Sequence, residues 1–100
     1  MQPKKSRWSK VYESSEEELI DFLDSRGLAT ERIHLTEFES TASQTTARDF
    51  ALWCAEGSMT LRLPGSKVSV QPGDSVQLPV GSEFELLAGI SGCVYYRSIT

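Results

Sequence analysis

From Arg32 onward the sequence repeats one pattern, in which short runs of alternating apolar and polar residues are followed by small polar turn sequences. Runs such as "RIHLTEF", "SMTLRLP" and "KVSVQP" have the period of two that is typical of strands with one buried face. The sequences "EGS", "PGS", "PGD", "VGS" and "GISG" separate the runs with residues that favour turns. Short strands joined by such turns predict an all-β fold, an antiparallel sandwich or barrel.

One segment before this pattern has the period of a helix. "SSEEELIDFLDSRG" begins with two serines, each followed three residues later by a glutamate, as in a capping box. Leu19, Phe22 and Leu23 form an apolar stripe, and Gly27 stands where a left-handed residue would end the helix. We predict one N-terminal amphipathic helix over about residues 15–26 that packs on its own domain; docking to a partner is the alternative.

The length of 100 residues and the charge distribution limit what the chain can be. We expect a single domain over residues 13–100, preceded by a basic, loosely ordered arm over residues 1–12. The net charge of −4 disfavours nucleic acid as a partner. No apolar run is long enough for a membrane span or a secretion leader, so we expect no membrane partner and a cytoplasmic location.

The segment "PGDSVQLPVGSEF" resembles the second sequence motif of the cupins, small antiparallel jelly-roll barrels. Gly73, Pro79 and Gly81 have the spacing of that motif, whereas Phe84 and Ala88 occupy its histidine and asparagine places. "LWCAEGSMTLRLPGSKVSVQPGD" resembles the preceding part of the family's chain, with a turn at Glu56-Gly57. The resemblance covers about half of the chain, and it implies a jelly-roll barrel with one site in its interior.

The first cupin motif normally supplies two histidines and a glutamate as metal ligands. Counting back from Gly57, the glutamate place falls on Phe50 and the histidine places fall near Gln44 and Thr46. Transition metals in proteins need at least three imidazole, thiolate or carboxylate ligands. The chain has one histidine, His34, and its two cysteines have no metal-binding spacing. We therefore expect no metal ligands, no cofactor and two reduced, buried thiols.

The resemblance directs attention to the inward-facing residues. Alternation places Leu52 and Cys54 on the side of Phe50, with Trp53 on the outer side, and one of the two C-terminal tyrosines inside. The interior is then either plain core or a pocket for a small, mostly apolar molecule. The candidate pocket residues are Gln44, Thr46, Phe50, Cys54, Phe84 and Tyr95.

Three functional hypotheses follow. The first is a metal-independent, cupin-like module that binds a small organic molecule or acts in regulation. The second is a small metabolic enzyme of isomerase or hydrolase type, with His34, Cys54, Tyr95 or Tyr96 as its acid or base; we assign no catalytic residue. The third is a structural or interaction protein that forms a homodimer, with Trp53 as an interface anchor.

Overall fold

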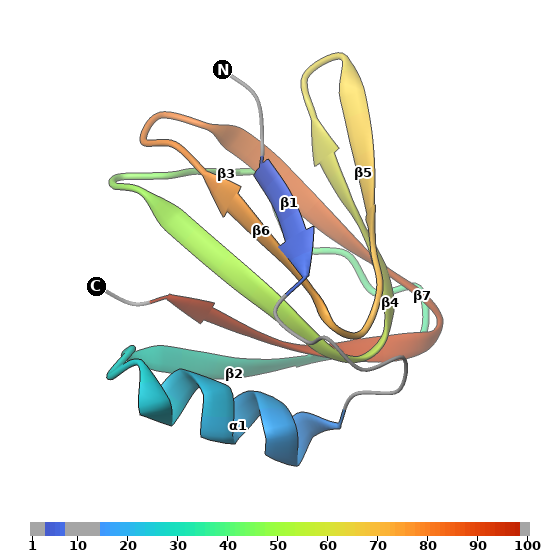
Figure 1. The fold of residues 1–100 in the computed structure, drawn as a ribbon. Coiled ribbons are helices and arrows are strands. Elements are labelled where there is room, and N and C mark those ends of the chain that lie inside the picture. The colour runs from blue at the N-terminus through green and yellow to red at the C-terminus, as the bar shows by residue number, and fades with distance from the viewer. Residues whose placement is uncertain (1–3, 8–14, 99–100) are drawn as a thin grey trace.

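The computed structural model describes residues 4–7 and 15–98, which form one helix and seven strands. The elements are β1 (Lys4–Arg7), α1 (Glu16–Ser25), β2 (Thr30–Leu35), β3 (Gln44–Thr45), β4 (Phe50–Leu63), β5 (Ser66–Val70), β6 (Asp74–Leu78) and β7 (Glu83–Ser98). The strand order is β1-β6-β4-β7-β2, with β5 added to β4 and β3 to β7, and the named strand pairs are antiparallel. The prediction of an antiparallel all-β fold with one N-terminal helix is confirmed (Figure 1).

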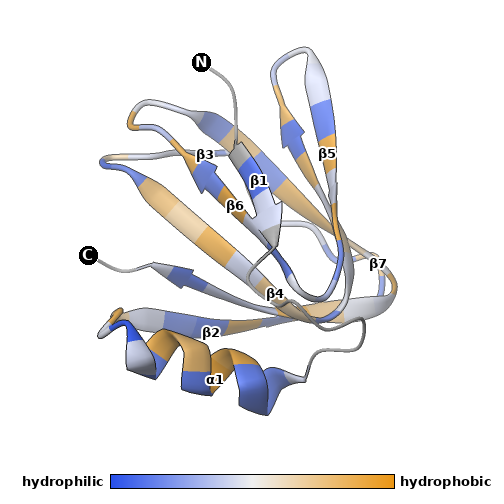
Figure 2. Ribbon diagram, viewed as in Figure 1, coloured by the Kyte–Doolittle hydropathy of each residue, from blue (hydrophilic) through white to orange (hydrophobic). Residues whose placement is uncertain are grey.

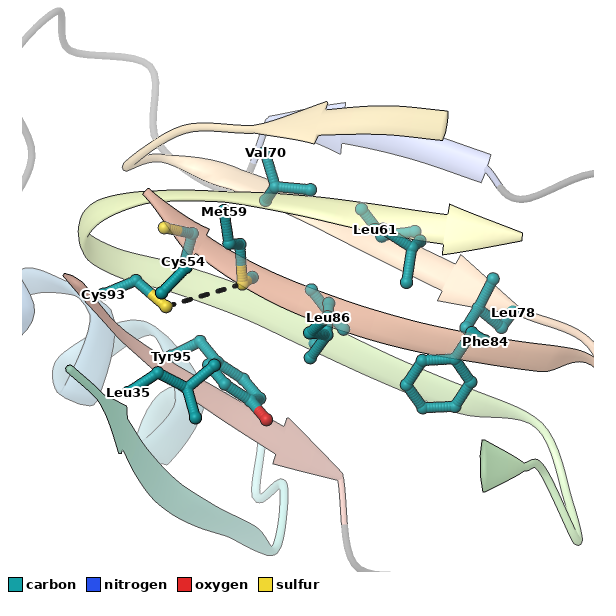
Figure 3. Packing of buried hydrophobic residues seen from close by; sticks show 13 residues of the cluster. Leu35, Cys54, Met59, Leu61, Val70, Leu78, Phe84, Leu86, Cys93 and Tyr95 are labelled. Carbon is teal, nitrogen blue, oxygen red and sulfur yellow. Dashed lines mark hydrogen bonds between the residues drawn. The ribbon is translucent and has the colours of Figure 1, made fainter. Parts of the chain in front are cut away.

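The curved sheet buries apolar side chains on both of its faces, as the alternating pattern requires. On the inner face, Leu52, Cys54 and Tyr95 belong to a core that also contains Leu35, Met59, Leu61, Val70, Val76, Leu78, Phe84, Leu86, Ala88 and Cys93 (Figure 3). On the outer face, Trp53, Ala55, Val94 and Tyr96 pack with Leu19 and Leu23 of α1. Consecutive residues of β4 and β7 thus alternate between the two cores.

Helix α1 has the two ends that the sequence predicts. The side chain of Ser15 accepts a hydrogen bond from the Glu18 backbone N–H at 3.2 Å, which caps the first turn. Gly27 follows the last turn with a φ of 64°, in the left-handed region. The apolar side of α1 faces the sheet, so the helix packs on its own domain (Figure 2). Within residues 15–98, α1 is too short and too polar to cross a membrane.

The outer-face position of Trp53 is as predicted, but its expected role as a dimer anchor is wrong. Trp53 is only 8% exposed because Leu19 and Leu23 of α1 cover it. A side chain buried by its own helix has no surface left for a second chain. Trp53 therefore stabilises the packing of α1 against β4.

Two predicted turns lie inside long strands. The chain does not reverse at Glu56-Gly57; β4 continues through this point with irregular register between Cys54 and Glu56 and between Gly57 and Met59. β7 likewise continues through "GISG". Bulges and glycines let a strand bend and serve two parts of a barrel without ending. The sequences "EGS" and "GISG" therefore mark bends within strands, and the expectation of a turn at Glu56-Gly57 was wrong.

The basic arm expected over residues 1–12 contains a strand. β1 pairs with β6, with Lys5 opposite Val76. Lys5 also places its Nζ 3.5 Å from Oδ2 of the buried Asp74. Backbone pairing and this ion pair order Lys4–Arg7, so the prediction of a loose arm is wrong for these four residues. Residues 1–3 and 8–14, including Trp8, lie outside the described residues.

Candidate functional site

Three of the six predicted pocket residues meet at one end of the inner face. Gln44 of β3 lies directly opposite Phe84 of β7, and residues opposite each other in an antiparallel pair project to the same face. Phe84 is buried, with 3% exposure, and its ring centroid lies 5.3 Å from that of Phe50. Gln44 and Phe50 are half-buried, so this end of the inner face reaches solvent. We call Gln44, Phe50 and Phe84 the aromatic end of the barrel.

Thr46 lies beside this end, but its hydroxyl is already used. Its Oγ1 donates to the Pro79 carbonyl at 2.8 Å and accepts from the Ser82 backbone N–H at 2.9 Å. These bonds fasten the tight turn before β7, in which Gly81 has the positive φ of 85° that such a turn requires. Thr46 therefore positions the strand that carries Phe84, and its predicted role as a polar point of the pocket stays a prediction.

Cys54 and Tyr95 lie opposite each other further along the inner face, away from Phe84 and Leu78 (Figure 3). Burial raises the pKa of both Cys54 and Tyr95 to about 12, so the thiol and the phenol are neutral at physiological pH. A neutral, buried thiol is a weak nucleophile. The Tyr95 hydroxyl makes no hydrogen bond to the residues that the structure describes. The six candidates therefore do not form one cluster. Gln44, Phe50 and Phe84 meet at one end of the inner face, whereas Cys54 and Tyr95 lie further along it.

The four predicted acid or base carriers do not form one group. Cys54 and Tyr95 are on the inner face, whereas His34 is exposed and Tyr96 belongs to the outer core under α1. Tyr96 donates its hydroxyl to Oε2 of Glu16 at 2.6 Å. Burial, and then this hydrogen bond, raise the pKa of Tyr96 to about 12. The sheet therefore separates the histidine from the inner thiol and phenol.

Sequence reasoning missed a charged residue on the inner face. Arg97 of β7 lies opposite Leu52 of β4 on one side and Glu31 of β2 on the other. It shares the face of Tyr95, two residues earlier. Its Nη2 lies 3.3 Å from Oε2 of Glu31, and its Nε is buried with no hydrogen-bond partner among the described residues. The alternation starting at Tyr95 was a signal that could have placed Arg97 inside.

The residues present do not fit the transition metal that the resemblance implies. The four implied ligand places hold Gln44, Thr46, Phe50 and Phe84: one amide, one hydroxyl already bonded to the backbone, and two aromatic rings. Over residues 4–7 and 15–98, no three His, Cys, Asp or Glu side chains lie close enough together to bind a metal ion. Such donors do not match the imidazole, thiolate and carboxylate sets that transition metals require.

A hollow of about 270 Å³ opens to solvent beside the aromatic end. Its walls combine outward-facing charged residues with the edge of the inner core. The lining residues are Ser43, Arg62, Leu63, Pro64, Glu83, Phe84 and Glu85. Phe84 therefore touches both the inner core and this outer hollow.

Comparison with known proteins identifies the fold. No family model and no curated protein sequence matches the chain. Among solved structures, a DUF861 family protein from Thermotoga maritima has a TM-score of 0.65 at 14% identity and covers 99% of this chain and 100% of its own. A cupin superfamily protein from Desulfitobacterium hafniense has a TM-score of 0.64 at 11% identity, with coverages of 96% and 74%.

A third solved structure, a protein of unknown function from Rhizobium leguminosarum bv. viciae, has a TM-score of 0.63 at 20% identity. The match covers 70% of this chain and 66% of that one, slightly less than two thirds of its length. At such identities the comparisons establish architecture and leave function open. The chain has a cupin-like jelly-roll fold.

Proposed function

We propose that this domain binds a small organic molecule at the aromatic end of its barrel, without a transition metal. The observation that carries the proposal is the contact between Phe50 and Phe84, with ring centroids 5.3 Å apart, at places where the cupin resemblance implies metal ligands. Two aromatic rings offer an apolar surface to a ligand and no donor to a metal.

The surroundings of these rings support a ligand with an apolar body and a few polar groups. The side-chain amide of Gln44 makes no hydrogen bond within the described part of the chain, and it lies on the same face as Phe84. Small-molecule sites typically combine apolar walls with a few such polar groups that fix the ligand's orientation. A regulatory role would use the same binding event.

The other hypotheses have less support. The four proposed acid or base carriers lie on two faces of the sheet, so no pair that includes His34 is assembled on the inner face. The homodimer stays a prediction, and it has lost its expected anchor, since Trp53 is covered by α1. We therefore favour a binding module over an enzyme or a purely structural protein.

Metal addition tests the proposal against a metal-dependent cupin. We expect Zn²⁺, Mn²⁺ or Fe²⁺ at micromolar concentration to leave the melting temperature unchanged, because a metal stabilises the folded state only by binding to it preferentially. Elemental analysis of protein purified without chelators should show no stoichiometric transition metal.

His34→Gln is the matched control for adventitious binding, since His34 is exposed and lies outside the aromatic end. A saturable rise in the melting temperature that persists in this variant would contradict the proposal. A rise that disappears with His34 would reveal a metal site on the protein surface; it would contradict the expected absence of a metal effect and leave binding at the aromatic end standing.

A further inference from the structure

We propose that Arg97 recognises a carboxylate group of the ligand, so that the bound molecule is a small carboxylate with an aromatic or apolar body. This inference rests on the proposed function and adds the chemical class of the ligand. It is carried by three observations: the unused hydrogen-bonding edge of Arg97, the contrasting use of Arg32, and the inner-face neighbours of Arg97.

The guanidinium of Arg97 is incompletely bonded. Within residues 15–98, its Nε is buried and has no hydrogen-bond partner. Buried polar atoms of native proteins nearly always have a partner, and the exceptions call for a functional or solvent explanation. Nη2 lies 3.3 Å from Oε2 of Glu31, a long contact for a charged pair. The Arg97 side chain is 33% exposed and that of Glu31 is 48% exposed, so solvent reaches this ion pair while Nε itself is buried behind it.

Arg32 shows how the same edge of a guanidinium is used when its partner fits. Its Nε donates to Oε2 of Glu16 at 2.5 Å and its Nη2 donates to Oε1 at 3.4 Å, so the contrast with Arg97 lies in the bonded Nε. This is the fork geometry that suits the two oxygens of a carboxylate. Glu31 reaches only Nη2 of Arg97 and leaves Nε free. A ligand carboxylate that bonds both nitrogens would therefore displace Glu31 and complete the fork.

The neighbours of Arg97 place this fork next to the aromatic end. Arg97 is opposite Leu52, and Phe50 is the next residue along β4 that projects to the same face. Diagonal neighbours in a sheet lie roughly 7–8 Å apart, which is within reach of aromatic and long side chains. The ring of the proposed ligand would contact Phe50 while its carboxylate meets Arg97.

Phenylacetate and its neutral analogue phenylacetamide are suitable probes, because they share a ring and differ in the carboxylate. We expect phenylacetate to bind more tightly than phenylacetamide in titrations that follow the backbone amide resonances by NMR, a readout that every variant retains. Arg97→Gln should weaken phenylacetate binding about tenfold or more, because it removes a charged hydrogen-bonding fork. Arg97→Lys keeps the charge without the fork and should also weaken binding.

Glu31→Gln provides the sharper variant because it should have the opposite effect. Removing the carboxylate that competes for Nη2 is expected to tighten phenylacetate binding severalfold, and a gain in affinity cannot result from a damaged fold. Arg62→Gln is the matched control: Arg62 is also a strand arginine paired with a glutamate, Glu85, but it lines the outer hollow. Its effect on phenylacetate binding should stay within about twofold.

The outcomes separate this inference from the proposed function. If phenylacetamide binds as tightly as phenylacetate and the Arg97 and Glu31 variants change nothing, the assignment of Arg97 is wrong while the binding module stands. If only Arg62→Gln weakens binding, the ligand occupies the outer hollow and the assignment also fails. If neither probe binds the unmodified chain, the proposed function itself is contradicted.

Discussion

Replacing Phe84 with alanine is expected to lower the free energy of unfolding by about 3–5 kcal/mol, the usual cost of truncating a buried phenylalanine. Phe84 is 3% exposed, packs against Phe50 and belongs to the inner core. The turn before it is held by Thr46, so the backbone is poorly placed to collapse into the space left by the ring. Denaturant unfolding measures the loss directly.

Glu83→Ala is the matched control, because Glu83 is exposed and adjacent to Phe84 on the same strand. Its effect should stay within about 0.5 kcal/mol, as for most surface substitutions. A loss for Phe84→Ala of less than about 1 kcal/mol would show that the ring is not part of the core. The proposed aromatic end would then have no physical basis.

Replacing Gly57 with alanine is the second substitution with a large expected effect. Gly57 has a φ of 71°, which costs an L-residue about 1–2 kcal/mol. An added Cβ would also overlap the Gly92 carbonyl oxygen, at 2.1 Å, in the neighbouring strand. This atom belongs to the backbone of β7 and cannot rotate away, and overpacking adds about 1–3 kcal/mol. The expected loss of unfolding free energy is therefore roughly 2–5 kcal/mol.

Gly65→Ala isolates the clash from the backbone strain. Gly65 has a similar φ of 79°, but an added Cβ would meet no atom within 4 Å. Its substitution should cost only the strain of the left-handed conformation, about 1–2 kcal/mol. Equal losses for the two variants would mean that β4 and β7 are not in close contact at Gly57.

The faces of the strands were predictable from the sequence, whereas some of the turns were not. Alternation correctly separated Phe50, Leu52 and Cys54 from Trp53, because side-chain direction in a strand is a local property with a period of two. The glycine at position 57 was assigned to a turn and lies in a bend. Turns and bulges both use glycines with positive φ, so only the partner strand distinguishes them.

The site was predictable only in part, for a related reason. The cupin resemblance placed Gln44 and Phe84 in the interior, and the structure pairs them across β3 and β7. The Thr46 hydroxyl bonds to Pro79, which is 33 positions away in the sequence. Arg97 pairs with Glu31, which is 66 positions away. No local pattern reports such contacts. The sequence likewise placed Trp53 outside but did not show that α1 covers it.

On our proposal, a small organic ligand binds on the inner face against Phe50 and Phe84. Intermolecular nuclear Overhauser effects between the ring protons of phenylacetate and those of the protein would locate the bound ligand. We expect cross-peaks from the phenylacetate ring to the rings of both Phe50 and Phe84, which lie 5.3 Å apart. Cross-peaks confined to Leu63 and Pro64, in the outer hollow, would contradict it.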